Sequence, residues 1–392
     1  MASGNVPEDV VREILLMLPV KSLLRSKSVC KSWYTLITKS SFISTHFNCN
    51  TSLKRSHCIL VKRILPEHVS PTESVLSFLS DEISSDDHVP PTEIIIPHFN
   101  HFLQMVGPCN GIVCLTDHRD IILCNPSIRD LKVLPAPSFN YPNGLLSTTL
   151  GVGFGFDPHS SGYKVIRIAE LYSDESGGYW FHSVKVEIYD LNTKIWREID
   201  AVVPCIWPFP CSELLFNGHF HWWANYEDDD GESILSFHIS TEVFQQIRLP
   251  CAFPEATDRA FLVLNESIAL FVFNTSEQTS FDIWLMIEYG VAESWTKYFT
   301  IGPLVQEVRP VVFWKHELLM EKANGQLVSC DLNSERLKEF QVYGAQESLR
   351  ALVYNESLVS IKLGSFSMLH AVVSPDIQST TNSKGIRFGL EV

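Results

Sequence analysis

A turn that leads into an apolar strand recurs along this chain and limits the folds it can adopt. The predicted strands start at turn positions 110, 162, 217, 265, 315 and 355, so successive starts are 52, 55, 48, 50 and 40 residues apart. The sixth of these strands is expected over Asn355–Ile361. One such unit cannot bury its apolar face alone, and regular units of about 40–50 residues are typical of propeller blades that pack side by side.

A second pattern, found in most of the units, predicts a hairpin. A strand is followed by a turn at Asp or Asn in most cases, then by Ser or Thr, and then by an aromatic or branched residue. Examples are Leu123–Leu131, Tyr189–Trp196, Phe237–Phe244 and Cys330–Leu337. Asp and Asn side chains accept backbone N–H groups at turns, and the later residue packs across the two strands. The body is therefore expected to be mainly β, with a six-bladed β-propeller. A two-sheet sandwich is the alternative, but it would not require the regular period.

The first fifty residues differ from this body because they predict three short helices. Pro7 suits a first helical position, and Glu8 and Asp9 favour the positive end of a helix. Apolar residues at three- and four-residue spacing follow, and Pro19 ends the first helix. A second helix is expected from Leu23 and a third around Trp33. This segment is short for an independent core, so it is either a cap on the main domain or a hook that needs a partner.

The residues of this segment resemble an F-box, the motif that connects a substrate receptor to the Skp adaptor of a cullin-type ubiquitin ligase. The resemblance spans roughly residues 5–47 and implies that these residues bind the adaptor: Pro7, Glu8, Asp9, Ile14, Leu15, Leu18, Pro19, Leu23, Arg25, Val29, Cys30 and Trp33. Leu15, Leu18, Pro19, Leu23 and Trp33 would bury against it. Ser26 departs from the pattern, because similar boxes usually carry an aromatic residue after the arginine.

The body also resembles a known arrangement, the F-box-associated domain of plant F-box proteins, which is a kelch-like β-propeller. The matching segments are Gly107–Gly111, Asn125–Arg129, Gly153–Asp157, Tyr163–Val165 and Asp190–Arg197. Residues 1–48 are then the F-box, 49–104 a connecting segment with strands and acidic loops, and 105–392 the propeller. Ile283–Val291 with Glu293–Trp295 resembles the S-locus F-box branch. That branch implies a pollen receptor that marks non-self style ribonucleases for ubiquitylation and degradation.

Charge is divided unequally between the two parts. Residues 1–50 contain six basic and three acidic side chains, a balance of +3, and the whole chain carries −15, so the remainder carries −18. This acidic body argues against nucleic acid as a partner, because phosphate binding needs clustered Lys and Arg. A basic protein such as an S-ribonuclease fits it better. The candidate substrate-binding residues are the acidic groups beside expected loops: Asp174, Glu175, Glu227, Asp228, Asp229 and Asp230.

The sequence predicts no catalytic residue, no metal site and no cofactor. Gly151, Gly153 and Gly155 lack the spacing of a dinucleotide loop and are followed by strand patterns. His219 and His221 share one strand face, a spacing that metals can use, but a half-buried hairpin explains them better. The ten scattered cysteines fit buried thiols in a reducing compartment.

The sequence predicts no membrane span and no secretory signal. A cytosolic location is therefore expected, with nuclear presence also allowed. Under the S-locus interpretation, the resemblance implies the cytosol of the pollen tube. Three alternatives stay open: a plant receptor for an immune or developmental regulator, a propeller scaffold with a helical cap, and a propeller enzyme.

Overall fold

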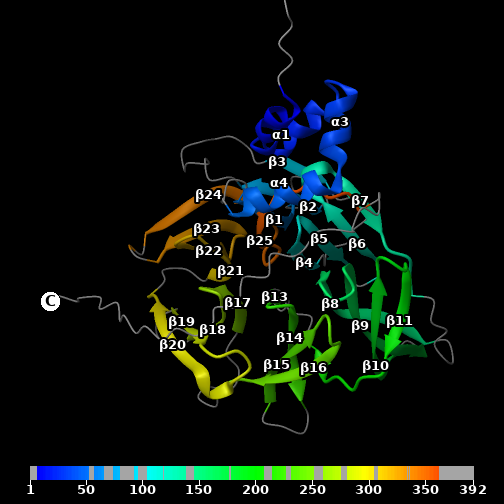
Figure 1. Ribbon diagram of the computed structural model, residues 1–392. Helices are drawn as coiled ribbons and strands as arrows, with labels where there is room; N and C mark the ends of the chain where they lie inside the picture. The colour runs from blue at the N-terminus through cyan, green and yellow to red at the C-terminus, as the bar shows by residue number, and fades with distance from the viewer. Residues whose placement is uncertain are drawn as a thin grey trace, which may run out of the picture.

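The computed structural model places four N-terminal helices against a ring of six β-sheets (Figure 1). It describes residues 7–52, 57–65, 74–79, 92–95, 104–117, 119–137, 145–175, 178–206, 214–226, 231–250, 259–274, 280–303, 308–332, 334 and 336–361. Strand numbering below follows the chain, and each sheet is called a blade.

The six blades are antiparallel sheets of four or five strands. Blade 1 contains β25 (Arg350–Asn355), β1 (His57–Ile64), β2 (Ser74–Leu79) and β3 (Thr92–Ile95), in that order. Blade 2 contains β4 (Gln104–Cys109), β5 (Ile112–Thr116), β6 (Ile121–Asn125) and β7 (Asp130–Val133). Blade 3 contains β8 (Leu146–Asp157), β9 (Gly162–Glu175), β10 (Gly178–Asp190) and β11 (Ile195–Ile199).

The other three blades complete the ring. Blade 4 contains β12 (Cys205–Ile206), β13 (Leu214–Phe216), β14 (His219–Tyr226), β15 (Gly231–His238) and β16 (Val243–Arg248). Blade 5 contains β17 (Arg259–Leu264), β18 (Ser267–Asn274), β19 (Ser280–Met286) and β20 (Trp295–Ile301). Blade 6 contains β21 (Val308–Trp314), β22 (Glu317–Lys322), β23 (Gln326–Asp331) and β24 (Leu337–Tyr343). The predicted mainly β, six-bladed propeller is therefore confirmed.

Strands from the two ends of the chain close the ring. β25 pairs with β1 in antiparallel register, with Leu352 opposite Leu60, and it neighbours both β4 and β21. The structure thus places three strands of residues 49–104, the expected connecting segment, in blade 1. The strand predicted over Asn355–Ile361 is wrong, because β25 ends at Asn355 and the following residues are buried but irregular. The second strand of this blade is instead β1, contributed by the other end of the chain.

The predicted turns are present at the hairpins. Asn110, Asn217, Asn265 and Lys315 all have left-handed backbone with φ of 49–59°, which suits tight connections between a blade's first and second strands. Asp190 Oδ1 accepts the N–H groups of Asn192 at 2.7 Å and Thr193 at 3.0 Å. The ring of Trp196 then lies 5.1 Å from that of Tyr189 across the hairpin. These contacts confirm the predicted turn and the packing of the aromatic residue behind it.

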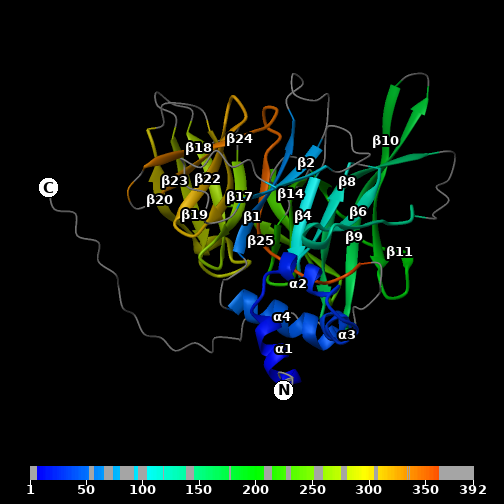
Figure 2. The same cartoon turned by 90° about the horizontal axis from the view of Figure 1, so that it is seen from above.

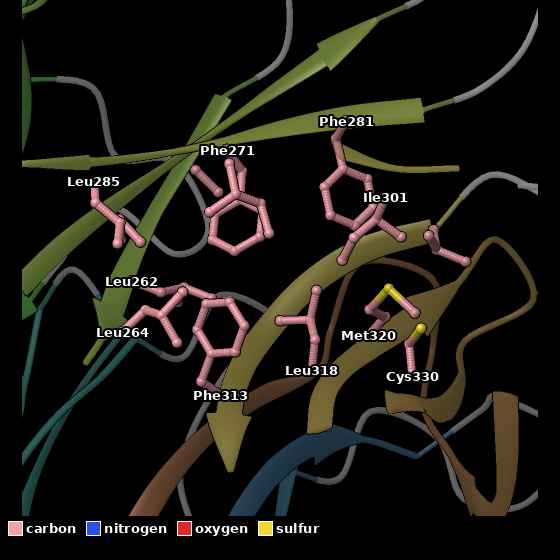
Figure 3. Packing of buried hydrophobic residues seen from close by; sticks show 14 of the residues in the cluster. Leu262, Leu264, Phe271, Phe281, Leu285, Ile301, Phe313, Leu318, Met320 and Cys330 are labelled. Atoms are coloured by element: carbon pink, nitrogen blue, oxygen red, sulfur yellow. The ribbon is translucent and has the colours of Figure 1, made fainter. Parts of the chain in front are cut away.

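Most of the core lies between adjacent blades. Figure 3 shows the cluster in which Phe271 and Phe281 of blade 5 pack toward Phe313, Leu318 and Met320 of blade 6. Between blades 3 and 4, a Cβ at Gly153 would lie 2.5 Å from the Phe220 ring, so glycine allows this close approach. The glycines of β8 are therefore packing residues, which agrees with the rejection of a dinucleotide loop.

A polar network also joins blades 3 and 4. The Lys164 ammonium lies 2.7 Å from Asp157 Oδ2 and 3.0 Å from Glu242 Oε1, and the Ser240 hydroxyl donates to Asp157 Oδ1 at 2.6 Å. Burial would raise the pKa of Asp157, but the hydrogen bonds from Lys164, Ser240 and Ser160 hold it well below its usual range. These contacts fix the turn that follows β8 to the turn that follows β15.

The N-terminal unit has one helix more than the three predicted. The expected helices are α1 (Glu8–Leu16), α2 (Val20–Ser26) and α3 (Lys31–Thr38), and α4 (Ser40–Ser52) follows directly. The first turn of α1 is acidic, as expected, but Pro7 lies at the N-cap and not at the first helical position. α2 begins at Val20, directly after Pro19 and three residues before the predicted start at Leu23. Figure 2 shows these helices on one face of the propeller, with the far end of the β9–β10 hairpin on the opposite side. No helix among the described residues is long and apolar enough to cross a membrane.

Candidate adaptor and substrate surfaces

The N-terminal helices bury a small core of their own. It is formed by Leu15, Leu16, Val20, Leu23, Leu36, Ile37 and Phe42, with Leu18 and Trp33 packed against it and partly buried. Leu15 and Leu23, both predicted to bury against an adaptor, are already covered by neighbouring helices of this chain. They support the outer surface of the helices from beneath.

A second set of residues remains on the outside of the same helices. The predicted residues that are exposed are Pro7, Glu8, Asp9, Ile14, Pro19, Arg25, Val29 and Cys30. Ile14 is 54% and Val29 62% exposed, and Val10, Met17 and Tyr34 are also exposed. Val10 and Ile14 are four residues apart and share one face of α1, and Met17 lies at the C-terminal end of this helix. Exposed apolar side chains gathered on so small a unit are typical of a protein–protein interface.

The propeller completes the core of the helices. Leu358, from the irregular segment 356–361 that follows β25, is buried in the same cluster as Leu15 and Val20. Ile128, from the turn between β6 and β7, packs against this cluster. The helices and the propeller therefore share one hydrophobic contact, whose propeller side comes from blade 2 and from the segment 356–361.

Blade 2 also satisfies the buried backbone of that segment. The Asn125 amide donates to the carbonyl oxygens of Ser357 at 3.0 Å and Val359 at 2.8 Å. Asp130 Oδ2 accepts the N–H of Ile361 and the hydroxyl of Ser360, each at 2.8 Å. Buried backbone groups outside regular structure need such partners, so these two side chains hold the segment in place.

The segment meets the N-terminus of α2 through a carboxylate. Glu356 accepts a hydrogen bond from the backbone N–H of Val20, the first residue of α2. Burial raises the pKa of Glu356, while the Val20 N–H and the nearby Lys21 act in the opposite direction. A carboxylate at this end interacts favourably with the positive N-terminal end of the helix dipole. The propeller therefore contributes a side-chain cap that α2 lacks in its own sequence.

Ser26, the departure from the F-box pattern, has a local role in α2. Its hydroxyl donates to the carbonyl oxygen of Ser22 at 2.9 Å, and the side chain is partly buried. The hydroxyl group is therefore satisfied without any partner protein.

The acidic candidates fall on two adjacent blades. Asp174 and Glu175 end β9, and their side chains lie outside what the structure describes. Glu227, Asp228, Asp229 and Asp230 lie outside the described residues, between the paired strand ends Tyr226 and Gly231. β9 and β14 each stand second in the spatial order of their blade, whereas the helices contact the segment that follows a first strand, β25, and the turn that follows a third strand, β6. The ends of β9 and β14 therefore lie on the propeller face opposite the helices.

Both histidines of β14 have hydrogen-bond partners within the protein. His221 is buried, its Nε2 lies 2.8 Å from the Tyr289 hydroxyl, and its Nδ1 lies 3.2 Å from the Leu214 carbonyl oxygen. Burial lowers the pKa of His221 to about 3, so the ring is neutral at physiological pH. Among the residues that the structure describes, no group of three or more His, Cys, Asp or Glu side chains could hold a metal ion.

Comparison with known families decides what the two parts are. The family described as the F-box domain matches residues 4–45, and the family described as the F-box associated beta propeller domain matches residues 37–367. The chain is an F-box protein with an F-box associated β-propeller. The second match includes α4 and blade 1, in agreement with the ring closure described above.

The relatives of this F-box protein include plant proteins of similar length. F-box protein CPR1 of Arabidopsis thaliana is 28% identical over 397 residues, which cover 91% of this chain and 89% of the relative. F-box/kelch-repeat protein At3g23880 of Arabidopsis thaliana is 26% identical over 327 residues, which cover 78% of this chain and 82% of the relative. These relatives share the plant F-box arrangement and do not point to the S-locus branch.

Sequence reasoning missed the propeller residues that support the F-box. Leu358 and Ile128 lie far from residues 7–52 in the chain, and no periodicity links them to the helices. The Asn125-Pro126-Ser127 segment did carry a signal, because it is one of the segments in which the sequence resembles the F-box-associated domain. Its role in holding the buried segment 356–361 becomes visible only in the structure.

Proposed function

We propose that this F-box protein is the substrate-recognition subunit of a Skp–cullin–F-box ubiquitin ligase. Its helices bind a Skp-type adaptor, and through the adaptor the cullin and RING subunits, while the propeller binds a protein substrate. The chain itself is non-catalytic, and ubiquitin transfer belongs to the partner subunits. The observation that carries the proposal is the division of the F-box side chains into a buried core and an exposed apolar set.

The proposed adaptor surface consists of exposed residues from α1 and from the junction of α2 and α3. Ile14 provides an apolar side chain on α1, and Val29 with the neighbouring Cys30 provides another group before α3. Pro7, Glu8, Asp9, Pro19 and Arg25 are further exposed positions of the same unit, and they are polar or rigid. An apolar centre with a polar rim is the usual composition of a protein–protein interface.

Binding of a purified Skp-type adaptor to the full chain tests this surface. The double variant Ile14→Ser with Val29→Ser should weaken adaptor binding by about 30-fold or more, since central apolar residues typically contribute about 2 kcal/mol or more. The matched control is Ile195→Ser with Val243→Ser, two propeller positions of similar exposure. Equal adaptor affinity of the two double variants would refute the proposed surface.

We propose further that the substrate is a basic protein, and specifically a non-self style S-ribonuclease recognised in pollen. This rests on the −18 balance of residues 51–392 and on the resemblance of Ile283–Trp295 to the S-locus branch. Acidic groups Asp174, Glu175, Glu227, Asp228, Asp229 and Asp230 would raise the association rate of a basic partner. The alternative is another plant substrate, such as an immune or developmental regulator.

A pull-down that contains the adaptor and a panel of style ribonucleases separates these substrates. We expect the chain to retain ribonucleases, and we expect retention to weaken as salt is added. Replacing Glu227 by Gln and Asp228–Asp230 by Asn should also weaken it. Adaptor binding without retention of any ribonuclease would remove the S-ribonuclease assignment and leave the receptor role. Transcript location provides a second test, because the S-locus role requires expression in pollen.

A further inference from the structure

Blade 3 is longer than the other blades on the face opposite the F-box. β8, β9 and β10 contain 12, 14 and 13 residues, whereas the described strands of the other blades contain at most eight. At about 3.3 Å per residue, the difference of six residues extends the β9–β10 hairpin by about 20 Å. Figure 2 shows the long strand β10 reaching the side of the propeller opposite the helices.

The extension carries a row of apolar side chains across three strands. Tyr172 of β9 is paired with Leu146 of β8 on one side and with Phe181 of β10 on the other. Directly paired residues of neighbouring antiparallel strands share one face of a sheet. Leu146 is 48% and Phe181 59% exposed, so this row is accessible although it consists of residues that favour burial.

The row faces the side on which blade 4 lies. β9 alternates without a bulge from Ile166 and Ile168, which are buried against Phe220 and Trp222 of blade 4, to Tyr172 on the same face. The apolar face of β9 therefore continues past the interface between the blades, where Tyr172 is partly buried and its paired neighbours Leu146 and Phe181 are exposed.

The described charge on the outer part of this face of blade 3 has one sign. Glu170 lies two residues before Tyr172 on β9, and so on the same face. On the described outer part of that face, from Ile168 to Tyr172 and on its partners in β8 and β10, there is no Lys or Arg. Lys185 pairs with Ala169, which places it on the other face, where its ammonium contacts Glu198. The backbone of Asp174 and Glu175 lies at the tip of the same hairpin.

We propose that the Leu146–Tyr172–Phe181 row is the docking surface for a basic segment of a partner protein that inserts an apolar side chain. The aromatic and aliphatic groups supply the apolar contact, and Glu170 on the same face selects positive charge. This inference rests on the proposed receptor function and names the part of the propeller that holds the substrate.

A random 12-residue phage-displayed peptide library, selected on the full chain in complex with the adaptor, tests the proposal. The expected result is enrichment of peptides that combine Lys or Arg with an apolar residue. The double variant Leu146→Ser with Phe181→Ser should bind these peptides at least tenfold more weakly. In Glu170→Gln, added salt should reduce peptide affinity less than it does in the unaltered chain. The control, Leu337→Ser with Val243→Ser, alters residues of similar exposure on blades 6 and 4 and should retain binding.

Several outcomes would overturn the docking surface. These are failure to enrich any peptide, enrichment of acidic peptides, and an equal loss of affinity in both double variants. Concentration-dependent dimerisation that Leu146→Ser with Phe181→Ser abolishes would assign the row to a second copy of the chain instead. Adaptor affinity is measured on every preparation, so loss of peptide binding with intact adaptor binding overturns only this surface. Failure of the unaltered chain to bind the adaptor would overturn the receptor function itself.

Discussion

Replacing Leu358 by alanine tests whether the F-box depends on the propeller for its stability. Leu358 is 3% exposed and is buried with Leu15, Val20 and Ile37 of the helices. A buried Leu→Ala change costs about 2–5 kcal/mol, because transfer free energy is lost and the remaining cavity collapses only in part. The partners of Leu358 lie on three helices, so filling the cavity would require the helices to move, and we expect a cost of about 3 kcal/mol.

Hydrogen exchange followed by mass spectrometry locates this loss, because it resolves separate peptides. A cost of about 3 kcal/mol corresponds to roughly 100-fold faster exchange of amides that open with the cluster. We expect faster exchange in α1–α4, while peptides from blade 5, on the far side of the ring, remain unchanged. The adaptor should restore protection of the helices, since it binds only the folded form.

A matched substitution controls for the loss of a leucine side chain. Leu337 is 54% exposed on β24, so Leu337→Ala should leave exchange unchanged throughout the chain. Unaltered protection of α1–α4 in Leu358→Ala, with a loss confined to the propeller, would refute the shared core. The helices would then fold without help from the segment 356–361.

Three further substitutions test other contacts by the free energy of unfolding. Burial lowers the pKa of Lys62 to about 7 in the folded chain, from 10.5 for an ordinary lysine. Between pH 7 and 10.5 Lys62 is therefore protonated in the unfolded chain but mostly neutral in the folded chain, so the free energy of unfolding rises with pH in this range. Lys62→Met should stabilise the chain by about 1–3 kcal/mol at pH 7 and flatten that rise, and an unchanged pH profile would contradict this. Asp157, whose pKa is lowered in the folded state, stabilises above the unfolded pKa of about 4. Asp157→Asn should therefore cost about 3 kcal/mol at pH 7 in chemical denaturation, and the difference from the unaltered chain should shrink as the pH falls below 4. Gly153→Ala should cost about 1–3 kcal/mol because its Cβ meets Phe220, and Phe220→Leu should recover part of that loss. Additive costs in the double variant would count against the contact.

The sequence predicted the blades better than it predicted how the ring closes. Turn residues and strand patterns are local, and Asn110 and Asn217 lie at the expected turns. The signal at Asn355 resembles these turns, but β25 pairs with β1, nearly three hundred residues earlier in the chain. No local pattern encodes that pairing, so the predicted sixth strand fell on a segment that is irregular in the structure.

The F-box shows a second limit of local patterns. The stripe that identified α1 contains both Ile14, which is exposed, and Leu15, which is buried. A short helix between two partners is apolar on more than one side, and periodicity cannot tell which side this chain covers itself. The acidic candidates illustrate the same point, since topology, and not composition, places the ends of β9 and β14 on one face.

The segment 356–361 has a mechanical consequence for a receptor of this kind. It is held by Asn125 and Asp130 on blade 2, buries Leu358 among the helices, and presents Glu356 to α2. The F-box therefore makes a buried, hydrogen-bonded contact with the propeller. A substrate on the opposite face would be held at a fixed distance from the adaptor. Weakening this contact should consequently impair ubiquitylation of a bound substrate even where binding of the adaptor and of the substrate are each retained.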